Sequence, residues 1–135
     1  MNQHLKSSAV AAASLPFTLK PLTPTIGCEI HDIDLAKPMD ATTLAAVRQT
    51  LLDWKVIFFR DQNITTGELE VHPFAPQKPG FPEILPITHD ENNKGKENKW
   101  HSDVTWREAP SLGSILRAIE VPDVGGDTLF SDMYA

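Results

Sequence analysis

The sequence predicts a mainly β fold with one flanking helix, and three observations support that prediction. Apolar and polar residues alternate over 17–19 and over 26–30, as they do in half-buried strands. A continuous apolar run over 56–59 has the length of a strand that is buried on both faces. Between these runs, Asp40 fits the N-cap of a helix, because the apolar residues that follow it recur at helical spacing.

The remaining elements follow in chain order. The expected helix has one apolar face, which carries Leu44, Val47, Leu51 and Trp54. Beyond it, 84–87 could form a short strand that a proline interrupts. Small and apolar residues predict a strand over 112–119, and a turn at 121–126 leads into a further strand over 127–131. Strands therefore outnumber helices in the predicted fold.

Composition limits the classes of function. The 135 residues include 12 basic and 18 acidic side chains, and the net charge of −6 argues against binding to nucleic acids or to anionic membranes. No apolar run approaches the length that spans a bilayer. The single Cys28 excludes an internal disulfide framework and fits a reducing, cytoplasmic compartment. Residues 1–15 are expected to be a disordered tail, and residues 16–135 to belong to one domain.

The most informative segment is 100–106, in which one residue separates His101 from Asp103. On a strand this spacing directs both side chains to the same face. They are two of the three ligands in a 2-His-1-carboxylate site, which binds non-haem Fe(II) and leaves positions open. The same pattern occurs at His89 and Glu91, but there it lies in a polar run typical of a solvated loop. His101 and Asp103 instead lie between two tryptophans, among residues that favour strands.

From about Phe17 onward the chain resembles the Fe(II)/2-oxoglutarate-dependent taurine dioxygenase (TauD/TfdA) family. Five landmarks in family order carry the resemblance: Ile26–Ile30 with Asp32–Leu35, Val56–Gln62, Gly67–Pro73, Trp100–Thr105 and Gly125–Thr128. The resemblance implies a double-stranded β-helix, or jelly roll, with flanking helices. It also implies that a small organic substrate is oxidised with O₂ and 2-oxoglutarate, that succinate and CO₂ are released, and that full-length relatives form homo-oligomers.

The resemblance also implies roles for individual residues. His101 and Asp103 would ligate Fe(II) and so form the catalytic centre. Thr128 would hydrogen-bond a carboxylate of 2-oxoglutarate, a task that suits a hydroxyl donor. His72 matches the position that faces the anionic group of the substrate. Without the resemblance, the sequence predicts that Thr128 is an ordinary strand residue and that His72 is a loop histidine.

Two positions argue against taurine itself as the substrate. Ala75 and Glu97 stand where taurine-specific members carry a phenol and an amide that contact the substrate. A carboxylate at position 97 would repel a sulfonate rather than hold it. Other sulfonates, sulfate esters and aryloxy acids remain open. Trp100 and Trp106 are expected to be packing residues, with Trp106 the better candidate for lining a pocket.

The sequence departs from the family pattern in two places. Thr66 runs directly into Gly67, where members usually carry an amphipathic helix of about ten residues. No histidine follows His101 and no arginine follows Arg117, although members place a distal iron ligand and a 2-oxoglutarate-binding arginine later in the chain. We therefore expect an N-terminal portion of a dioxygenase, produced by truncation, a gene-model error or pseudogene decay, that is poorly active alone.

Two other classes of function stay open. The chain could be a non-catalytic remnant that folds in part or binds a partner chain. Alternatively, His101 and Asp103 could bind a different metal in a cupin-like or zinc-binding protein. Cupin sites normally draw on further histidines close to the first, and the following positions offer none.

Overall fold

The chain divides into two compact units, which are described here separately. The computed structural model describes residues 15–64, 78–82, 84–90, 92–93, 95 and 99–134. The first unit joins the residues up to Thr65 with the segment from Leu129 onward, and the second unit is Thr66–Thr128. Within the described residues, every helix and strand belongs to the first unit. The expected tail lies outside the described residues, except for its last member, Leu15.

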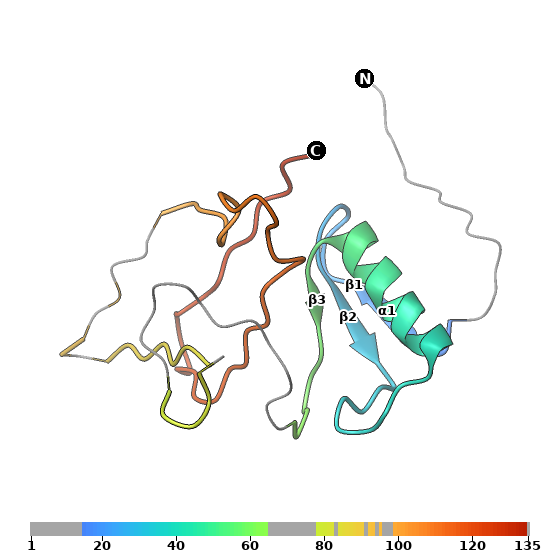
Figure 1. Ribbon diagram of the computed structural model, residues 1–135, viewed down its shortest axis with the longest axis horizontal. Helices are drawn as coiled ribbons and strands as arrows, with labels where there is room; N and C mark the ends of the chain where they lie inside the picture. The colour runs from blue at the N-terminus through green and yellow to red at the C-terminus, as the bar shows by residue number, and fades with distance from the viewer. Residues whose placement is uncertain are drawn as a thin grey trace. The chain divides into compact units, whose positions relative to one another are not determined.

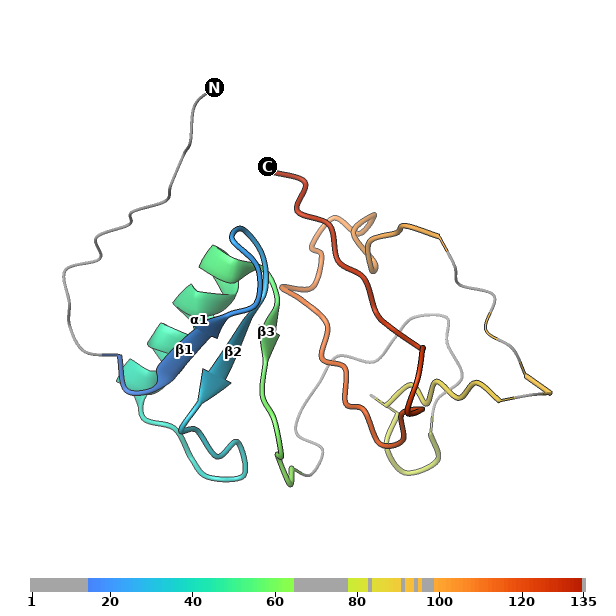
Figure 2. The same cartoon turned by 180° about the vertical axis from the view of Figure 1, so that it is seen from behind.

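The first unit is a three-stranded sheet with one helix beside it (Figure 1). Strand β1 (Thr18–Pro21) pairs antiparallel with β2 (Cys28–His31), and β2 pairs in parallel with β3 (Ile57–Phe58). Helix α1 (Ala41–Trp54) connects the two parallel strands, and the reverse view shows the strand order again (Figure 2). The strands expected over 17–19, 26–30 and 56–59 are therefore confirmed, with β3 shorter than the apolar run.

The turn into β2 requires glycine at position 27. Gly27 has a φ of +84°, a conformation that side chains with a Cβ rarely adopt. Its N–H donates to the carbonyl of Trp54 at 2.9 Å, and the N–H of Cys28 donates to Val56 at 3.1 Å. The first landmark of the sequence thus joins the start of β2 to the end of the helix and the start of β3.

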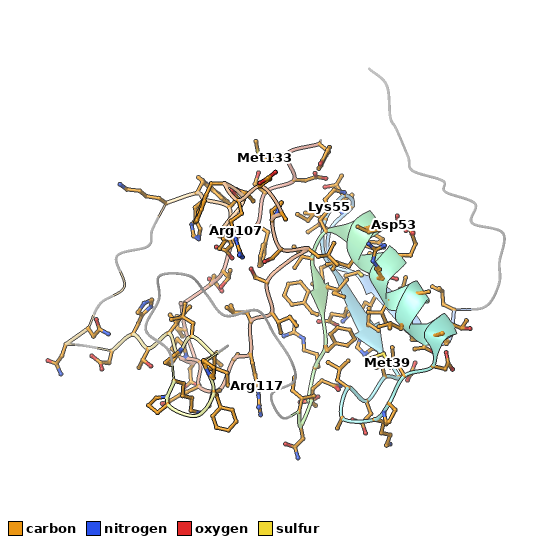
Figure 3. All side chains as sticks on the ribbon, viewed as in Figure 1. Met39, Asp53, Lys55, Arg107, Arg117 and Met133 are labelled. Atoms are coloured by element: carbon orange, nitrogen blue, oxygen red, sulfur yellow. The ribbon has the colours of Figure 1, made fainter. Side chains whose placement is uncertain are left out.

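Both ends of α1 are capped. The Asp40 carboxylate accepts from the N–H of Thr43 at 2.7 Å, which confirms the expected N-cap and lowers the pKa of Asp40. At the other end Lys55 adopts a left-handed conformation, with φ 65°, and its N–H donates to Leu51 at 2.7 Å. Figure 3 shows Asp53 and Lys55 at this end of the helix.

Three of the four residues expected on the buried face of α1 are half-buried, namely Val47, Leu51 and Trp54, and the fourth is not. Leu44 is 57% exposed, whereas Thr50 is buried and its hydroxyl donates to the carbonyl of Ala46 at 2.9 Å. A three-stranded sheet covers only a narrow stripe of a helix, and successive residues point about 100° apart. Leu44 falls outside this stripe, which runs through Thr43, Ala46, Val47, Thr50, Leu51 and Trp54.

Alternation along β2 separates an apolar face of the sheet from a polar one. Cys28 and Ile30 are buried on one face, and Glu29 and His31 point to the other. Cys28 is fully buried, as expected of a small hydrophobic residue, and burial raises the pKa of its thiol to about 11. Within the described residues, Phe17 completes the buried hydrophobic core.

Segment 129–132 contacts β3, which is an edge strand of the sheet. The Phe130 ring meets that of Phe58 edge-on, with centroids 6.4 Å apart. Two residues further on, the Asp132 carboxylate pairs at 3.5 Å with Lys55, the C-cap residue of α1. Asp132 also accepts from the N–H of Tyr134 at 2.9 Å, as a residue at the start of a helix does. The expectation that β3 is buried on both faces is wrong, because both of its residues are only half-buried.

The later strands expected from the sequence are not observed. Segments 84–87, 112–119 and 127–131 carry no strand, and the described part of the second unit shows only an isolated bridge between Lys78 and Phe81. A strand persists only where a neighbour takes up its backbone hydrogen bonds. Among the described residues no segment pairs in this way with these three. None of the described helices could cross a bilayer, since α1 has 14 residues.

Candidate metal centre

The segment that carries His101 and Asp103 forms turns, so the expectation of a strand there is wrong. Val104 has a φ of 49°, and its carbonyl accepts from the N–H of Arg107 at 3.4 Å. The hydroxyls of Ser102 and Thr105 are 2.7 Å apart. Short polar side chains thus close the turn locally, which is the usual alternative when no ladder partner is present.

The turn brings the two candidate ligands close together. Here Nε2 of His101 lies 3.5 Å from Oδ1 of Asp103. The two side chains are 61% and 58% exposed, so an ion from solvent can reach both.

The other polar atom of each side chain has a partner of its own. Nδ1 of His101 lies 2.8 Å from the carbonyl of Lys99. A carbonyl only accepts, so we assign the ring proton to Nδ1, which leaves the lone pair of a neutral imidazole on Nε2. The hydroxyl of Ser114 donates to Oδ2 of Asp103 at 2.9 Å, which leaves Oδ1 facing the imidazole.

The distance between Nε2 of His101 and Oδ1 of Asp103 suits a single metal ion. Donors about 2.1 Å from one ion, at angles between octahedral and tetrahedral, are about 3.0 to 3.4 Å apart. The observed 3.5 Å is close to that range, so His101 and Asp103 fit an iron ion as two of its ligands. No group of three potential metal ligands occurs among the described residues, so this part of the chain supplies two donors rather than three.

The other residues singled out in the sequence are not part of this arrangement. Thr128 is exposed, and the structure brings it into no hydrogen bond with His101 or Asp103. The predictions for His72, for positions 75 and 97, and for position 91 fall outside the described residues. Trp100 and Trp106 are 70% and 67% exposed, so the expectation that they are packing residues is wrong for this chain.

His89 lies in a loop, as the sequence indicates. The carboxylate of its neighbour Asp90 accepts from the N–H groups of Asn92 and Asn93, at 2.8 and 2.7 Å. This pattern closes a polar turn of the kind that aspartate favours. These hydrogen bonds give the carboxylate of Asp90 a role in the turn, and no metal ion is needed to explain its position beside His89.

Ser114 is the residue of this site that sequence reasoning missed. It lies eleven positions after Asp103, in a segment expected to be a strand. No spacing rule connects residues that far apart in a chain, and a serine among apolar residues carries no chemical signal of its own. Only the three-dimensional arrangement identifies it.

A second polar cluster surrounds Glu29 on the polar face of the sheet. Oε1 accepts from Nε and Nη2 of Arg60, at 3.0 and 2.9 Å, and Oε2 lies 3.4 Å from Lys20 Nζ and 3.2 Å from His31 Nε2. The Arg60 hydrogen bonds, ahead of the contribution of Lys20, lower the pKa of this buried carboxyl. The cluster joins β1, β2 and the segment after β3, and we assign it a structural role.

Gln62 ties two landmarks of the sequence together. Its amide oxygen accepts from the N–H of Leu35 at 2.7 Å, and its amide nitrogen donates to the carbonyls of Ile33 and Arg60, at 3.0 and 2.9 Å. One side chain thereby satisfies three backbone groups of two loops. These two landmarks stabilise the first unit, whereas His101 and Asp103, in the fourth landmark, make no contact of this kind with the sheet.

The Glu29 cluster predicts a dependence of stability on acidification. The pKa is lowered by folding, so the cluster stabilises the fold above the ordinary value of 4.5, and this contribution is lost as pH falls through the folded value. We expect Glu29→Gln to be less stable than the wild type at pH 7 and to lose less on acidification. Urea denaturation at pH 7 and at an acidic pH below the ordinary value of 4.5, followed by the circular dichroism of α1, measures the free energy of unfolding of both proteins.

Asp53→Asn serves as the matched control, because Asp53 is exposed on α1 and accepts from Gln49 at 2.9 Å. We expect the free energy of unfolding of the Asp53→Asn variant to change with pH in the same way as that of the wild type. If Glu29→Gln and wild type lost stability in parallel, the Glu29 cluster would not be the source of the acid sensitivity.

Comparison with known proteins places these features in a family. The family model described as "Taurine catabolism dioxygenase TauD, TfdA family" matches residues 18–135. An alpha-ketoglutarate-dependent sulfate ester dioxygenase from Pseudomonas putida is 33% identical over 94% of this chain and 45% of its own length. An alkylsulfatase from Acinetobacter baylyi is 34% identical over 84% of this chain and 39% of its own.

A further relative is an alpha-ketoglutarate-dependent sulfonate dioxygenase from Saccharomyces cerevisiae, 28% identical over 84% of this chain and 33% of its own length. The chain thus spans less than half the length of each of these relatives. The matched segment nevertheless runs from β1 through the His101–Asp103 pair to the end of the chain. This chain is therefore a member of the taurine catabolism dioxygenase TauD, TfdA family.

Proposed function

We propose that this chain supplies the histidine and carboxylate iron ligands of an Fe(II)- and 2-oxoglutarate-dependent dioxygenase that oxidises a small sulfated or sulfonated organic substrate. The observation that carries the proposal is the approach of His101 Nε2 and Asp103 Oδ1 to 3.5 Å within the family-matched segment. Residues 16–135 would form the N-terminal part of the dioxygenase domain, whose complete fold would be a jelly roll in a cytoplasmic homo-oligomer.

The proposal gives each residue a chemical task. His101 offers the lone pair of Nε2, and Asp103 offers an anionic oxygen that lowers the net positive charge of a bound cation. Thr128 would donate its hydroxyl proton to a carboxylate oxygen of 2-oxoglutarate, and His72 would face the anionic group of the substrate. Fe(II) with 2-oxoglutarate and O₂ supplies the oxidising power when bound. The protein's own part is to hold and orient these groups.

The relatives favour a sulfate ester over taurine. Two of the most similar relatives are named for sulfate esters or alkyl sulfates. At position 97 a glutamate stands where taurine-specific members carry an amide, and a carboxylate there disfavours a compact sulfonate.

The test measures succinate formed by a chimera that joins residues 1–135 to the remaining part of the Pseudomonas putida relative. We expect succinate formation to depend on Fe(II) and on an alkyl sulfate, and to be lower with taurine. An Asp103→Ala chimera, shown to be folded by its thermal transition, is the control and should form none. A folded chimera that forms succinate equally with and without Asp103 would refute the proposal, and a folded chimera with no turnover would favour a non-catalytic remnant.

A further inference from the structure

We infer that Ser114 is a positioning residue, which holds the carboxylate of Asp103 so that one oxygen faces the imidazole of His101 and a metal ion. The inference rests on the proposed function, because it concerns the same pair of ligands. It goes beyond that function by giving a role to a residue outside the ligand motif.

The hydrogen bond of Ser114 distinguishes the two oxygens of Asp103. Oδ2 accepts from the Ser114 hydroxyl at 2.9 Å, and Oδ1 lies 3.5 Å from His101 Nε2. A carboxylate that is free to rotate presents either oxygen to an ion and loses rotational freedom when it binds. Fixing Oδ2 therefore prepares Oδ1 for coordination before the ion arrives.

The histidine is held in a corresponding way. The carbonyl of Lys99 accepts from Nδ1 of His101 at 2.8 Å, which fixes the ring and its tautomer. Each candidate ligand thus uses one polar atom for a protein partner and directs the other toward its neighbour. Ligands of metal sites commonly show this division between an orienting bond and a coordinating atom.

Packing does not explain why Ser114 lies against Asp103. Every residue of 111–120 is exposed, including Ile115 and Leu116 on the C-terminal side of Ser114. A Cβ added to the preceding Gly113 would meet no atom within 4 Å. The segment is therefore not pressed onto the turn that carries His101 and Asp103 by buried side chains, and the hydrogen bond of Ser114 is one contact that connects the two.

The test compares Co(II) affinities of full-length variants by isothermal titration calorimetry in the absence of 2-oxoglutarate. Ser114→Thr and Ser114→Val have the same branched shape and differ by the hydroxyl. We expect Ser114→Thr to bind as the wild type does, and Ser114→Val and Ser114→Ala to lose roughly 10- to 100-fold in affinity. Ser131→Ala is the matched control, because Ser131 is exposed and lies in the first unit, outside the turn that carries His101 and Asp103.

A second comparison separates positioning from a general structural role. In an Asp103→Ala background the Ser114→Val change should have no further effect on Co(II) affinity, because the group that Ser114 orients is gone. Equal affinities of Ser114→Val and Ser114→Thr would overturn the inference, and so would equal losses in the presence and absence of Asp103. If instead Asp103→Ala and His101→Ala themselves bound Co(II) like the wild type, the proposed function would fail as well.

Discussion

Replacing His101 with alanine is expected to abolish the binding of Co(II) or Fe(II) to this chain, whereas replacing His89 is expected to leave it unchanged. His101 Nε2 and Asp103 Oδ1 are the two donors that the structure brings together, and removal of one leaves a single exposed carboxylate. Such a carboxylate resembles any other on a chain with 18 acidic residues. Titration calorimetry under anaerobic conditions measures the affinity with either ion.

The wild-type affinity is itself expected to be weak. Two protein donors leave the rest of the coordination sphere to water, and the complete facial arrangement uses three. His89→Ala is a stringent control because His89 is also followed by acidic residues, although its loop is closed by Asp90. Equal loss in His101→Ala and His89→Ala, or no loss in either, would show that the ion binds elsewhere.

The sequence predicted the first unit well because its signals are local. The N-cap at Asp40 and the alternation through Cys28 and Ile30 depend on neighbours within a few residues, and the structure shows both. The exposed Leu44 shows the limit of such signals. Helical spacing identified an apolar face, but the narrow stripe that the sheet covers depends on partners distant in sequence.

The later strands could not be predicted in the same way. The segments 112–119 and 127–131 have the composition of strands, yet strand formation depends on a neighbouring strand that composition does not reveal. Among the described residues, the segment from Leu129 onward instead contacts β3 through Phe130 and the C-cap residue of α1 through Asp132. Strand propensity indicates that a segment can form a strand if a partner strand is present, and whether that partner is present depends on the whole fold.

The candidate site shows the same division between local and distant information. The spacing of His101 and Asp103 identified both side chains, although the turn that brings them together was expected to be a strand. The roles of Lys99 and Ser114 were not predictable, because a backbone carbonyl and a serine leave no distinctive pattern in a sequence. Candidate metal ligands are therefore easier to predict from a sequence than the groups that orient them.

Purified alone, this chain is expected to self-associate and to bind a hydrophobic dye such as anilinonaphthalene sulfonate. The hydrophobic core of the described residues consists of Phe17, Cys28 and Ile30. By contrast, large apolar side chains are exposed along the segment from position 100 onward, among them Ile115, Leu116, Ile119, Val124, Leu129 and Met133. Apolar surface on this scale marks an interaction or aggregation surface.

The size of the effect follows from the burial that these side chains do not achieve. Burying one aliphatic side chain contributes roughly 1.5–3 kcal/mol, and a typical domain is stable by only about 5–15 kcal/mol. The burial energy that is not gained is therefore comparable to much of a domain's net stability, even when only Ile115, Leu116 and Ile119 are counted. We expect sedimentation velocity to show oligomers, and calorimetry to show no single sharp transition, while the circular dichroism of α1 persists.

A matched pair of variants locates the surface responsible. A triple substitution of Ile115, Leu116 and Ile119 by threonine is expected to raise the monomer fraction and to lower dye binding. Leu44→Thr, at an exposed leucine of the first unit, is expected to change neither, because it removes an isolated apolar side chain. A wild-type chain that sediments as a monomer and melts in one sharp two-state transition would show instead that the exposed segment needs no cover, and that the chain is a self-sufficient small fold.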